Sequence, residues 1–304
     1  MTASRTATNL GPVDIAEEIE LAPRRLGLSR RNALRLLTGG MAGCLMDGTW
    51  LEPGRLSVTR EDVRCRRLAP GFDGLRIGLL ADFHFRPDED EELVAKVIAE
   101  TQREKLDLIL LAGDFVDSAP SVLTPLLEHL EKLRATHGVF AVMGNHDGWN
   151  ASRSMMRRSF EKAGISFLGN QHSRLSIRGE SLAVAGTDFV WRGNPDAARA
   201  LKGIATDTPV IAMVHEPDYF DVMTAQREIL LQVSGHTHGG QCRVPLLGYA
   251  PVSVKYGKKY QYGGFTGGDS NLFVTRGVGT TGPRVRFACP PEFAILTLRA
   301  ADQV

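Results

Sequence analysis

Short apolar runs alternate along this chain with longer segments whose apolar residues recur at helical spacing. Apolar runs of this length that end at Gly, Asp, Asn or His indicate buried strands. Leu93, Val94, Val97 and Ile98 recur on one helical face behind an acidic first turn, which indicates a helix. This alternation predicts an α/β fold whose sheets are covered by helices. The expected strands are 75–81, 106–112, 139–143, 181–185, 209–214, 229–233, 272–275 and 293–298, and the expected helices are 88–105, 122–134 and 152–163.

Side chains that commonly bind metal ions come at or just after the ends of five expected strands. They are Asp82, Asp114, Asn145, His215 and His236. Because sites in open α/β sheets form beyond the carboxyl ends of the strands, we expect these five side chains to lie along one edge of the core.

The same five segments offer more donors than one metal ion needs. With His84 and His238 they supply two aspartates, one asparagine and four histidines, and His146 is left over. This is too many donors for one tetrahedral zinc with an open position, but it suits two ions that share a carboxylate. Taken singly, an aspartate at a strand end could be a helix N-cap, and Asn145 could form a turn with its neighbouring glycine. All five together favour a two-metal site.

Five blocks between residues 72 and 300 carry a resemblance to a known family. They read DFH at 82–84, GDFVD at 113–117, GNHD at 144–147, VHE at 214–216 and GHTH at 235–238. In this order, they resemble the calcineurin-like metallophosphoesterases. The resemblance implies a four-layer α/β/β/α sandwich of two mixed sheets flanked by helices, the metallo-dependent phosphatase fold.

The resemblance also implies a role for each residue of the blocks. Asp114 would bridge two metal ions, His146 would face the substrate, and Asp147 would orient His146 through a hydrogen bond. Asp117 would play a structural or supporting part instead of binding metal. The first ion would be held by Asp82, His84 and His238, and the second by Asn145, His215 and His236.

Two such divalent cations, of Mn, Fe, Zn, Co or Ni, would share a water and lower its pKa. The resulting hydroxide would attack phosphorus in line, while His146 stabilises the growing charge or protonates the leaving oxygen. We therefore expect hydrolysis of a phosphodiester or pyrophosphate bond. A phosphomonoesterase, a dinuclear hydrolase acting on other bonds and a non-catalytic metal-binding scaffold or partner-binding protein are the alternatives.

The C-terminal third of the chain contains candidate substrate-binding residues. Arg276, Arg284 and Arg286 could bind a substrate phosphate, or they could form structural ion pairs in a loop. The order of the blocks here resembles the YkuE/YaeI-like bacterial branch, which includes enzymes that cleave UDP-2,3-diacylglucosamine. That implies a small-molecule or lipid-linked phosphoester as the partner. Residues 249–265, rich in Tyr, Lys and Gly, could form a substrate-facing or membrane-facing flap or a surface hairpin.

Residues 1–50 differ from the rest and are expected to be an export signal or a membrane-associated segment. Arginines precede a short apolar run at 36–46, a layout typical of secretory signals. Residues 29–35, SRRNALR, resemble a twin-arginine signal, and 41–44 faintly resemble a lipoprotein cleavage box ending at Cys44. The alternative is an amphipathic helix on the domain or on a membrane surface, with the protein at the cytoplasmic face or in the cytoplasm. Residues 50–54 would be a linker, and the metallophosphoesterase domain would span 56–304.

Composition narrows the partners further. The 304 residues carry a net charge of +1, which gives no electrostatic reason to expect nucleic acid as a partner. The four cysteines form no C-x-x-C pair and are too few for a disulfide scaffold.

Overall fold

The computed structural model describes residues 29–245, 247–248, 250–251 and 253–301. The chain divides into two units between Ala42 and Gly43. Arg24 and Arg25, which belong to the expected export signal, lie outside the described residues, as do Tyr249 and Val252 of the expected flap.

Helix α1, Arg30–Met46, buries none of its residues. It begins after Ser29, whose hydroxyl accepts a hydrogen bond from the Asn32 N–H at 3.3 Å. Leu34, Leu37 and Leu45 are each more than half exposed. No helix among the described residues is both long enough and apolar enough to cross a membrane.

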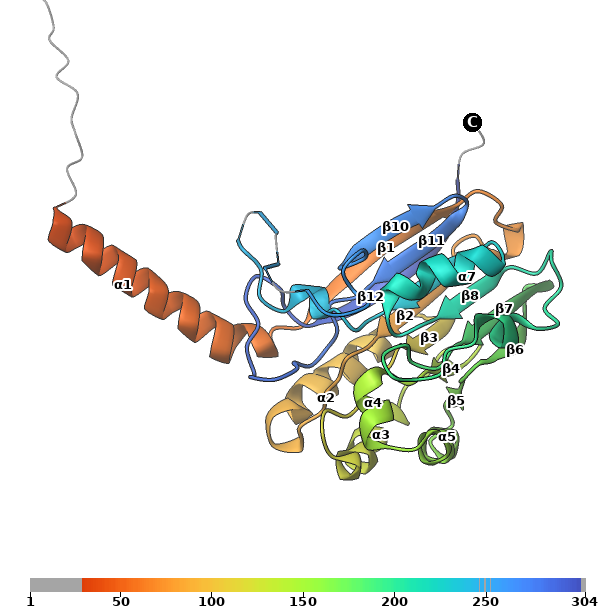
Figure 1. Cartoon of the computed structure of the whole chain (residues 1–304), viewed down its shortest axis with the longest axis horizontal. Helices are drawn as coiled ribbons and strands as arrows, with labels where there is room; N and C mark the ends of the chain where they lie inside the picture. The colour runs from red at the N-terminus through yellow and green to blue at the C-terminus, as the bar shows by residue number, and fades with distance from the viewer. Residues whose placement is uncertain (1–28, 246, 249, 252, 302–304) are drawn as a thin grey trace, which may run out of the picture. The chain divides into compact units, whose positions relative to one another are not determined.

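The described part of the second unit is built on two mixed six-stranded sheets (Figure 1). Sheet A has the order β1-β12-β2-β3-β4-β5, in which β12 is parallel to β1 and antiparallel to β2. Sheet B has the order β10-β11-β9-β8-β7-β6, with parallel pairing from β11 to β7 and an antiparallel strand at each edge. The strands of sheet A are β1 Ser57–Cys65, β2 Arg76–Leu80, β3 Leu108–Leu111, β4 Val139–Ala141, β5 Ser166–Phe167 and β12 Glu292–Ala300. Those of sheet B are β6 Gln171–Ile177, β7 Glu180–Gly186, β8 Val210–Met213, β9 Leu231–Ser234, β10 Gly263–Gly267 and β11 Ser270–Val274.

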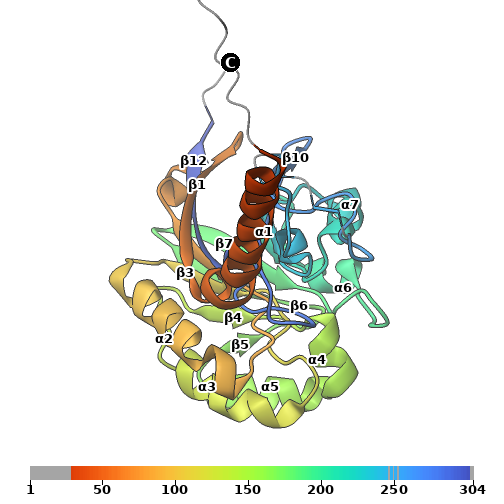
Figure 2. The same cartoon turned by 90° about the vertical axis from the view of Figure 1, so that its left-hand side faces the viewer.

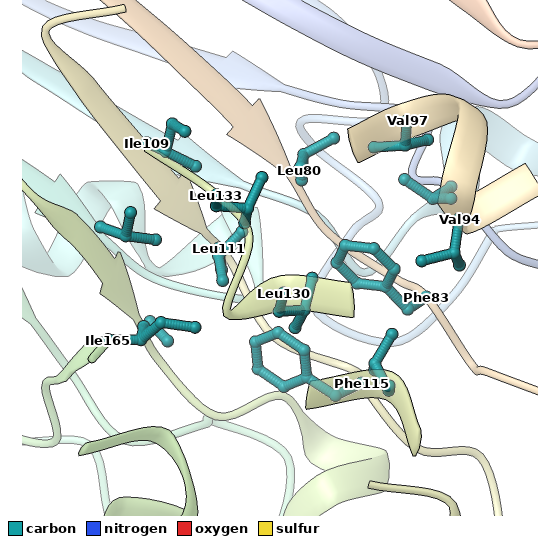
Figure 3. Packing of buried hydrophobic residues seen from close by; sticks show 14 of the residues in the cluster. Leu80, Phe83, Val94, Val97, Ile109, Leu111, Phe115, Leu130, Leu133 and Ile165 are labelled. Atoms are coloured by element: carbon teal, nitrogen blue, oxygen red, sulfur yellow. The ribbon is translucent and has the colours of Figure 1, made fainter. Parts of the chain in front are cut away.

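Alternate residues along the central strands point into different layers, because side chains alternate across a strand. In β3, Leu108 and Leu110 lie in the core shared by the two sheets, whereas Ile109 and Leu111 pack against helices. On β8, Val210 and Ala212 likewise face the helices that cover sheet B. Figure 3 shows the helix-facing core of sheet A, with Phe83 and Phe115 among its aromatic members. Each central strand is therefore apolar on both faces, as the unbroken apolar runs in the sequence require.

Helices α2, α3 and α5 cover sheet A, and α6 and α7 cover sheet B (Figure 1 and Figure 2). This four-layer sandwich confirms the predicted fold class. The helices of this unit are α2 Pro87–Arg103, α3 Leu123–Leu130, α4 Asn145–Asn150, α5 Arg153–Lys162, α6 Ala197–Leu201 and α7 Phe220–Gln226.

Each of the eight predicted strands and three predicted helices is present, with ends moved by a few residues. Strands β1, β5, β6 and β10 were not predicted, and each lies at the edge of a sheet. β1, SVTREDVRC, is mostly polar because it pairs on one side only and keeps much of its surface in water. Edge strands of this kind lack the apolar run by which the central strands are recognised.

The prediction that residues 50–54 form a linker is wrong. Asp47–Leu51 and Glu52–Gly54 are helical turns packed into the domain. Glu52 is buried, and its carboxylate accepts hydrogen bonds from the backbone N–H groups of Ala288 and Cys289. The folded domain therefore begins before Leu56, since a carboxylate buried in this way ties the segment to the C-terminal loop.

Candidate metal centre

The two sheets bring their polar strand ends together at one edge of the sandwich. Asp82 and Asp114 follow β2 and β3 of sheet A, and Asn145 opens α4 just beyond β4. His215 and His236 follow β8 and β9 of sheet B. The structure thus places residues from five separate segments at a common site, as the sequence predicts.

Three overlapping groups of donor atoms could each hold a metal ion. Their members are Asp82, His84 and His238; His84, Asp114 and His146; and Asp114, His215 and His236. Within each group, the donor atoms all lie within 4.8 Å of one another. The second group joins the other two through shared members, so the donors form one continuous cluster.

Asp114 occupies the middle of this cluster. Its Oδ2 lies 3.1 Å from Nε2 of His215 and 3.5 Å from Nε2 of His84. One carboxylate between two imidazoles from different sheets has the geometry that a shared ligand needs.

The backbone is unusual at five of these positions. Asp82, His84, Asp114, His236 and His238 all have positive φ, between 40° and 71°. Side chains other than glycine rarely adopt this left-handed conformation, and such strain concentrates at functional sites. The fold therefore accepts a local cost to turn these side chains toward one point.

A glycine beside the histidines is required by close packing. A Cβ at Gly235 would lie 2.5 Å from Oδ2 of Asp82, inside the contact distance. The His236 N–H instead donates to the Asp82 carboxylate, at 2.8 and 3.1 Å from its two oxygens. Gly235 therefore lets the SGHTHGG loop that follows β9 of sheet B pack directly against the end of β2 in sheet A.

Hydrogen bonds to the outer nitrogens hold three of the rings. Nδ1 of His84 lies 3.2 Å from Oδ1 of Asp117, Nδ1 of His215 lies 2.7 Å from the Ala112 carbonyl, and Nε2 of His236 lies 2.7 Å from the Lys255 carbonyl. An imidazole that donates from one nitrogen presents the other as a lone pair, as metal-binding histidines do. Each ring is thus left with one nitrogen for the cluster.

Two observations show that a cation fits among these donors. Oδ1 of Asn145 is buried and has no hydrogen-bond partner in the described part of the chain. Nε2 of His215 is buried in the same way and also has no hydrogen-bond partner there. Buried polar atoms are normally paired, so a divalent ion beside them would satisfy groups that the protein leaves open.

Burial and neighbouring charges raise the pKa values of some groups in the cluster and lower those of others. Burial raises the pKa of Asp82 to about 6 against the opposing effect of His215. Burial would also raise the pKa of Asp114, but the adjacent His215 outweighs it and holds that pKa well below its usual range. Burial and the charge on His215 lower the pKa of His236 to about 3, while burial and His84 lower the pKa of His238 well below its usual value. His236 and His238 are therefore neutral at ordinary pH, the form that binds metal.

His146 sits at the open side of the cluster. Its side chain is 23% exposed, whereas those of His84 and His215 are fully buried. Its Nδ1 lies 3.2 Å from the Asp117 carbonyl and 3.3 Å from Oδ1 of Asp117. Burial would lower the pKa of His146, but Asp117 and Asp114 outweigh that effect and raise the pKa to about 9.

The prediction that Asp147 orients His146 is wrong, because both oxygens of Asp147 are occupied elsewhere. They accept hydrogen bonds from the backbone N–H groups of Gly144, Asp114, Phe115 and Val116, at 2.8–3.0 Å. Asp117 holds the His146 ring in its place. Asp147 instead ties the start of α4 to the loop after β3, and so fixes the two blocks that carry Asp114 and Asn145.

The prediction that Arg286 binds substrate phosphate is also wrong. The side chain is fully buried, and its nitrogens donate to the carbonyl groups of Arg276, Gly277, Gly279 and Cys289 at 2.6–3.1 Å. Arg276 pairs with Glu292 at 2.9 Å, and Arg284 lies 3.5 Å from Oδ1 of Asp90. For Arg276 and Arg284 these contacts favour the structural alternative of ion pairs.

Sequence reasoning missed three residues that support the site. Glu216 is buried beside His215, and its carboxylate accepts hydrogen bonds from the Val190 and Trp191 N–H groups. Lys255 holds His236 through its carbonyl group, which no side-chain pattern reveals. Trp149 could have been found from its spacing, because it lies one helical turn after Asn145 on α4.

Comparisons with known proteins find a matching family model, similar sequences and a solved structure. A family model of the calcineurin-like phosphoesterases matches residues 75–240. The metallophosphoesterase YkuE of Bacillus subtilis is 31% identical over 289 residues, which cover 90% of this chain and 99% of YkuE. The phosphodiesterase YaeI of Escherichia coli is 33% identical over 82% of this chain and 90% of YaeI. A dimetal phosphatase structure from Danio rerio is 13% identical, with a TM-score of 0.48 over 75% of this chain and 93% of that one.

The family model covers more than half of the chain, and it contains every block that supplies a candidate ligand. Together with the clustered donors, this identifies the cofactors as two divalent metal ions. The chain belongs to the calcineurin-like phosphoesterases and is a metal-dependent phosphoesterase.

Proposed function

We propose that this chain hydrolyses a phosphodiester or pyrophosphate bond at a centre of two metal ions bridged by Asp114. The position of the Asp114 carboxylate between His84 and His215 carries this proposal. The first ion would be held by Asp82, His84 and His238, and the second by Asn145, His215 and His236.

When bound, the two ions would supply positive charge for the phosphoryl oxygens and an activated hydroxide for in-line attack. The chain's own residues would do the rest. His146, the more exposed imidazole, lies where a substrate must approach, so it would donate a proton to the leaving oxygen or hydrogen-bond to the phosphoryl group. Asp117 would keep the His146 ring in position through Nδ1.

We propose a diester over a monoester because YaeI, of similar length and sequence, is named a phosphodiesterase. A lipid-linked substrate such as UDP-2,3-diacylglucosamine is the specific class that we propose. The exposed leucines of α1 support it, since they would hold the enzyme close to a membrane surface.

For the same reason, we propose that residues 1–50 direct the protein to a membrane or through it. Arg30, Arg31 and Arg35 precede or flank the exposed apolar residues of α1, an arrangement suited to anionic headgroups and to a twin-arginine signal. Cell fractionation of the full chain and of an Arg30→Gln/Arg31→Gln variant tests this. Loss of the membrane or exported fraction in the variant is the expected result, and a soluble cytoplasmic wild type contradicts it.

The central test compares hydrolysis of bis-p-nitrophenyl phosphate and p-nitrophenyl phosphate. The full chain would be stripped of metal and reloaded with manganese, with Asp114→Asn as the inactive variant and Asp88→Asn, an exposed aspartate, as the matched control. We expect faster, metal-dependent cleavage of the diester, lost in Asp114→Asn alone. Preference for the monoester would identify a phosphomonoesterase instead, and two bound ions without turnover of either would favour a non-catalytic scaffold.

A further inference from the structure

An aromatic surface lies beside the metal centre and has no part in holding it. Trp149 lies on α4 four residues after Asn145 and three after His146, so the three side chains share one face of the helix. The Trp149 ring centroid lies 4.9 Å from that of His146. Unlike the buried rings of the metal cluster, Trp149 is 40% exposed.

Trp191 forms the second half of this surface. Its ring meets that of Trp149 edge to face at 5.0 Å, and its ring centroid lies 6.3 Å from that of His236. Nε1 of Trp149 donates to the Trp191 carbonyl at 3.2 Å. The surface therefore borders the cluster on both sides, next to His146 from sheet A and His236 from sheet B.

Trp191 is held in place by residues that also support the metal site. The Trp191 N–H donates to the buried carboxylate of Glu216 at 2.7 Å. Nζ of Lys255 lies 5.9 Å from the Trp191 ring and 4.8 Å from the Tyr256 ring, while the Lys255 carbonyl faces His236. This partly exposed aromatic pair, held by hydrogen bonds close to the reacting groups, is suited to binding a ligand, because ordering it costs little on binding.

We propose that Trp149 and Trp191 form a subsite for a planar ring that the substrate carries close to its scissile phosphate. This rests on the proposed function, since it places the ring next to His146 on a substrate whose phosphate sits at the metal ions. A flat ring can stack on a partly exposed tryptophan, whereas an alkyl chain needs an enclosed apolar cleft to be buried. The ring of Trp149 would therefore favour substrates that carry a flat ring.

The test is equilibrium binding of small phosphate esters to the manganese-loaded full chain by calorimetry. Phenyl phosphate and cyclohexyl phosphate have rings of the same carbon number, one flat and one puckered, and hexyl phosphate carries a straight chain. Because stacking on an aromatic side chain is worth about fivefold or more in affinity, we expect phenyl phosphate to bind at least fivefold more tightly than the other two.

Variants of Trp149 test whether its ring causes the preference for phenyl phosphate. Trp149→Leu keeps bulk but removes the flat face, so the preference for phenyl phosphate should disappear, whereas Trp149→Phe should retain most of it. Trp50→Leu, at a 77% exposed tryptophan outside the site, should behave as wild type. Equal affinity for phenyl and cyclohexyl phosphate in the wild type, tighter binding of hexyl phosphate, or an unchanged preference in Trp149→Leu would each overturn the subsite.

Binding of inorganic phosphate distinguishes a failure of the subsite from a failure of the proposed function. If inorganic phosphate binds and the ring preference is missing, the subsite alone fails. If the metal-loaded chain binds no phosphate at all, the proposed function fails and the subsite fails with it.

Discussion

The metal centre and the segment 276–292 both contain buried charged side chains. They differ in whether the protein itself supplies hydrogen-bond partners for the buried polar atoms. In the metal centre, Oδ1 of Asn145 and Nε2 of His215 have no hydrogen-bond partner among the described residues. In the C-terminal segment, the guanidinium of Arg286 is surrounded by carbonyl groups that accept from each of its three nitrogens.

The difference shows how a functional charged group can be told from a structural one. Burying an ionic group without partners is costly, so a fold that leaves donors open must recover the cost from a ligand. Arg286 is satisfied by the protein and needs nothing more. Residue type alone does not separate the two cases, because arginine is equally suited to phosphate and to a cage of carbonyl oxygens.

Replacing Asp114 should have the largest effect on function and little effect on stability. Asp114→Asn removes the shared charge, so both ions should be lost and turnover should fall by at least about 10²–10³-fold. The amide oxygen can still accept from the His146 N–H, which Asp114 Oδ1 now does at 2.9 Å. Metal analysis, the diester assay and urea unfolding of the metal-free protein check this, and retention of both ions by the variant would contradict it.

Replacing His146 should separate chemistry from metal binding. His146→Gln should retain two ions and lose about 10²–10⁴-fold in kcat, the usual size of a general acid's contribution. His137→Gln, which alters a histidine outside the cluster, is the matched control. The measurement is kcat with metal content determined on the same sample. Metal loss in His146→Gln would show that this residue is a ligand instead.

Replacing Arg286 should lower stability, whereas replacing Asp114 should mainly lower activity. Arg286→Met removes the guanidinium from four carbonyl groups, of which Gly277 still accepts from the Glu292 N–H. The free energy of unfolding should therefore fall by about 3 kcal/mol or more. Urea unfolding measures this, with Arg158→Met on α5 as an arginine control. An unchanged stability combined with a raised KM would restore the view that Arg286 binds phosphate.

The smallest effect concerns an ion pair away from both regions. Hydrogen bonds from Arg76 and Arg60, each 2.5 Å long, lower the pKa of Glu104. A lowered pKa stabilises the fold above the unfolded value of 4.5, and this stability is lost as pH falls through the lower folded value. Glu104→Gln should therefore destabilise the protein by at most about 1 kcal/mol at pH 7, and by less at pH 3. Thermal unfolding of both proteins at the two pH values tests the sign.

The core and the metal donors could be predicted from the sequence because each has a local signal. Strands β2, β3 and β8 are unbroken apolar runs, and Asp82, Asp114 and His215 follow them within three residues. What could not be predicted depends on contacts between distant segments. The partner of His146 proved to be Asp117, 29 residues earlier, and not its neighbour Asp147. Likewise, Glu52 became part of the domain through backbone groups more than 200 residues away.

The arginines also show the limit of prediction from sequence, because the sequence suggested a function that the structure does not support. A loop with Arg276, Arg284 and Arg286 has the composition of a phosphate-binding loop, and only its surroundings show otherwise. Arg286 holds the carbonyls of Gly277 and Gly279, and Gly279 in turn donates to the Asp82 carbonyl at 2.7 Å. Its contribution to the metal centre is thus to fix the loop that supports Asp82, a role that no spacing in the sequence encodes.

The position of β12 in sheet A has a consequence for how the protein is made. This strand, Glu292–Ala300, lies between β1 and β2. Until it has been synthesised, β1 has no partner strand and β2 pairs only with β3. A nascent chain on the ribosome would carry an open edge on β2, directly before Asp82, and open edges invite mispairing with other chains. Synthesis and metal loading should therefore occur in sequence, with the donors assembled only after the whole domain has left the ribosome.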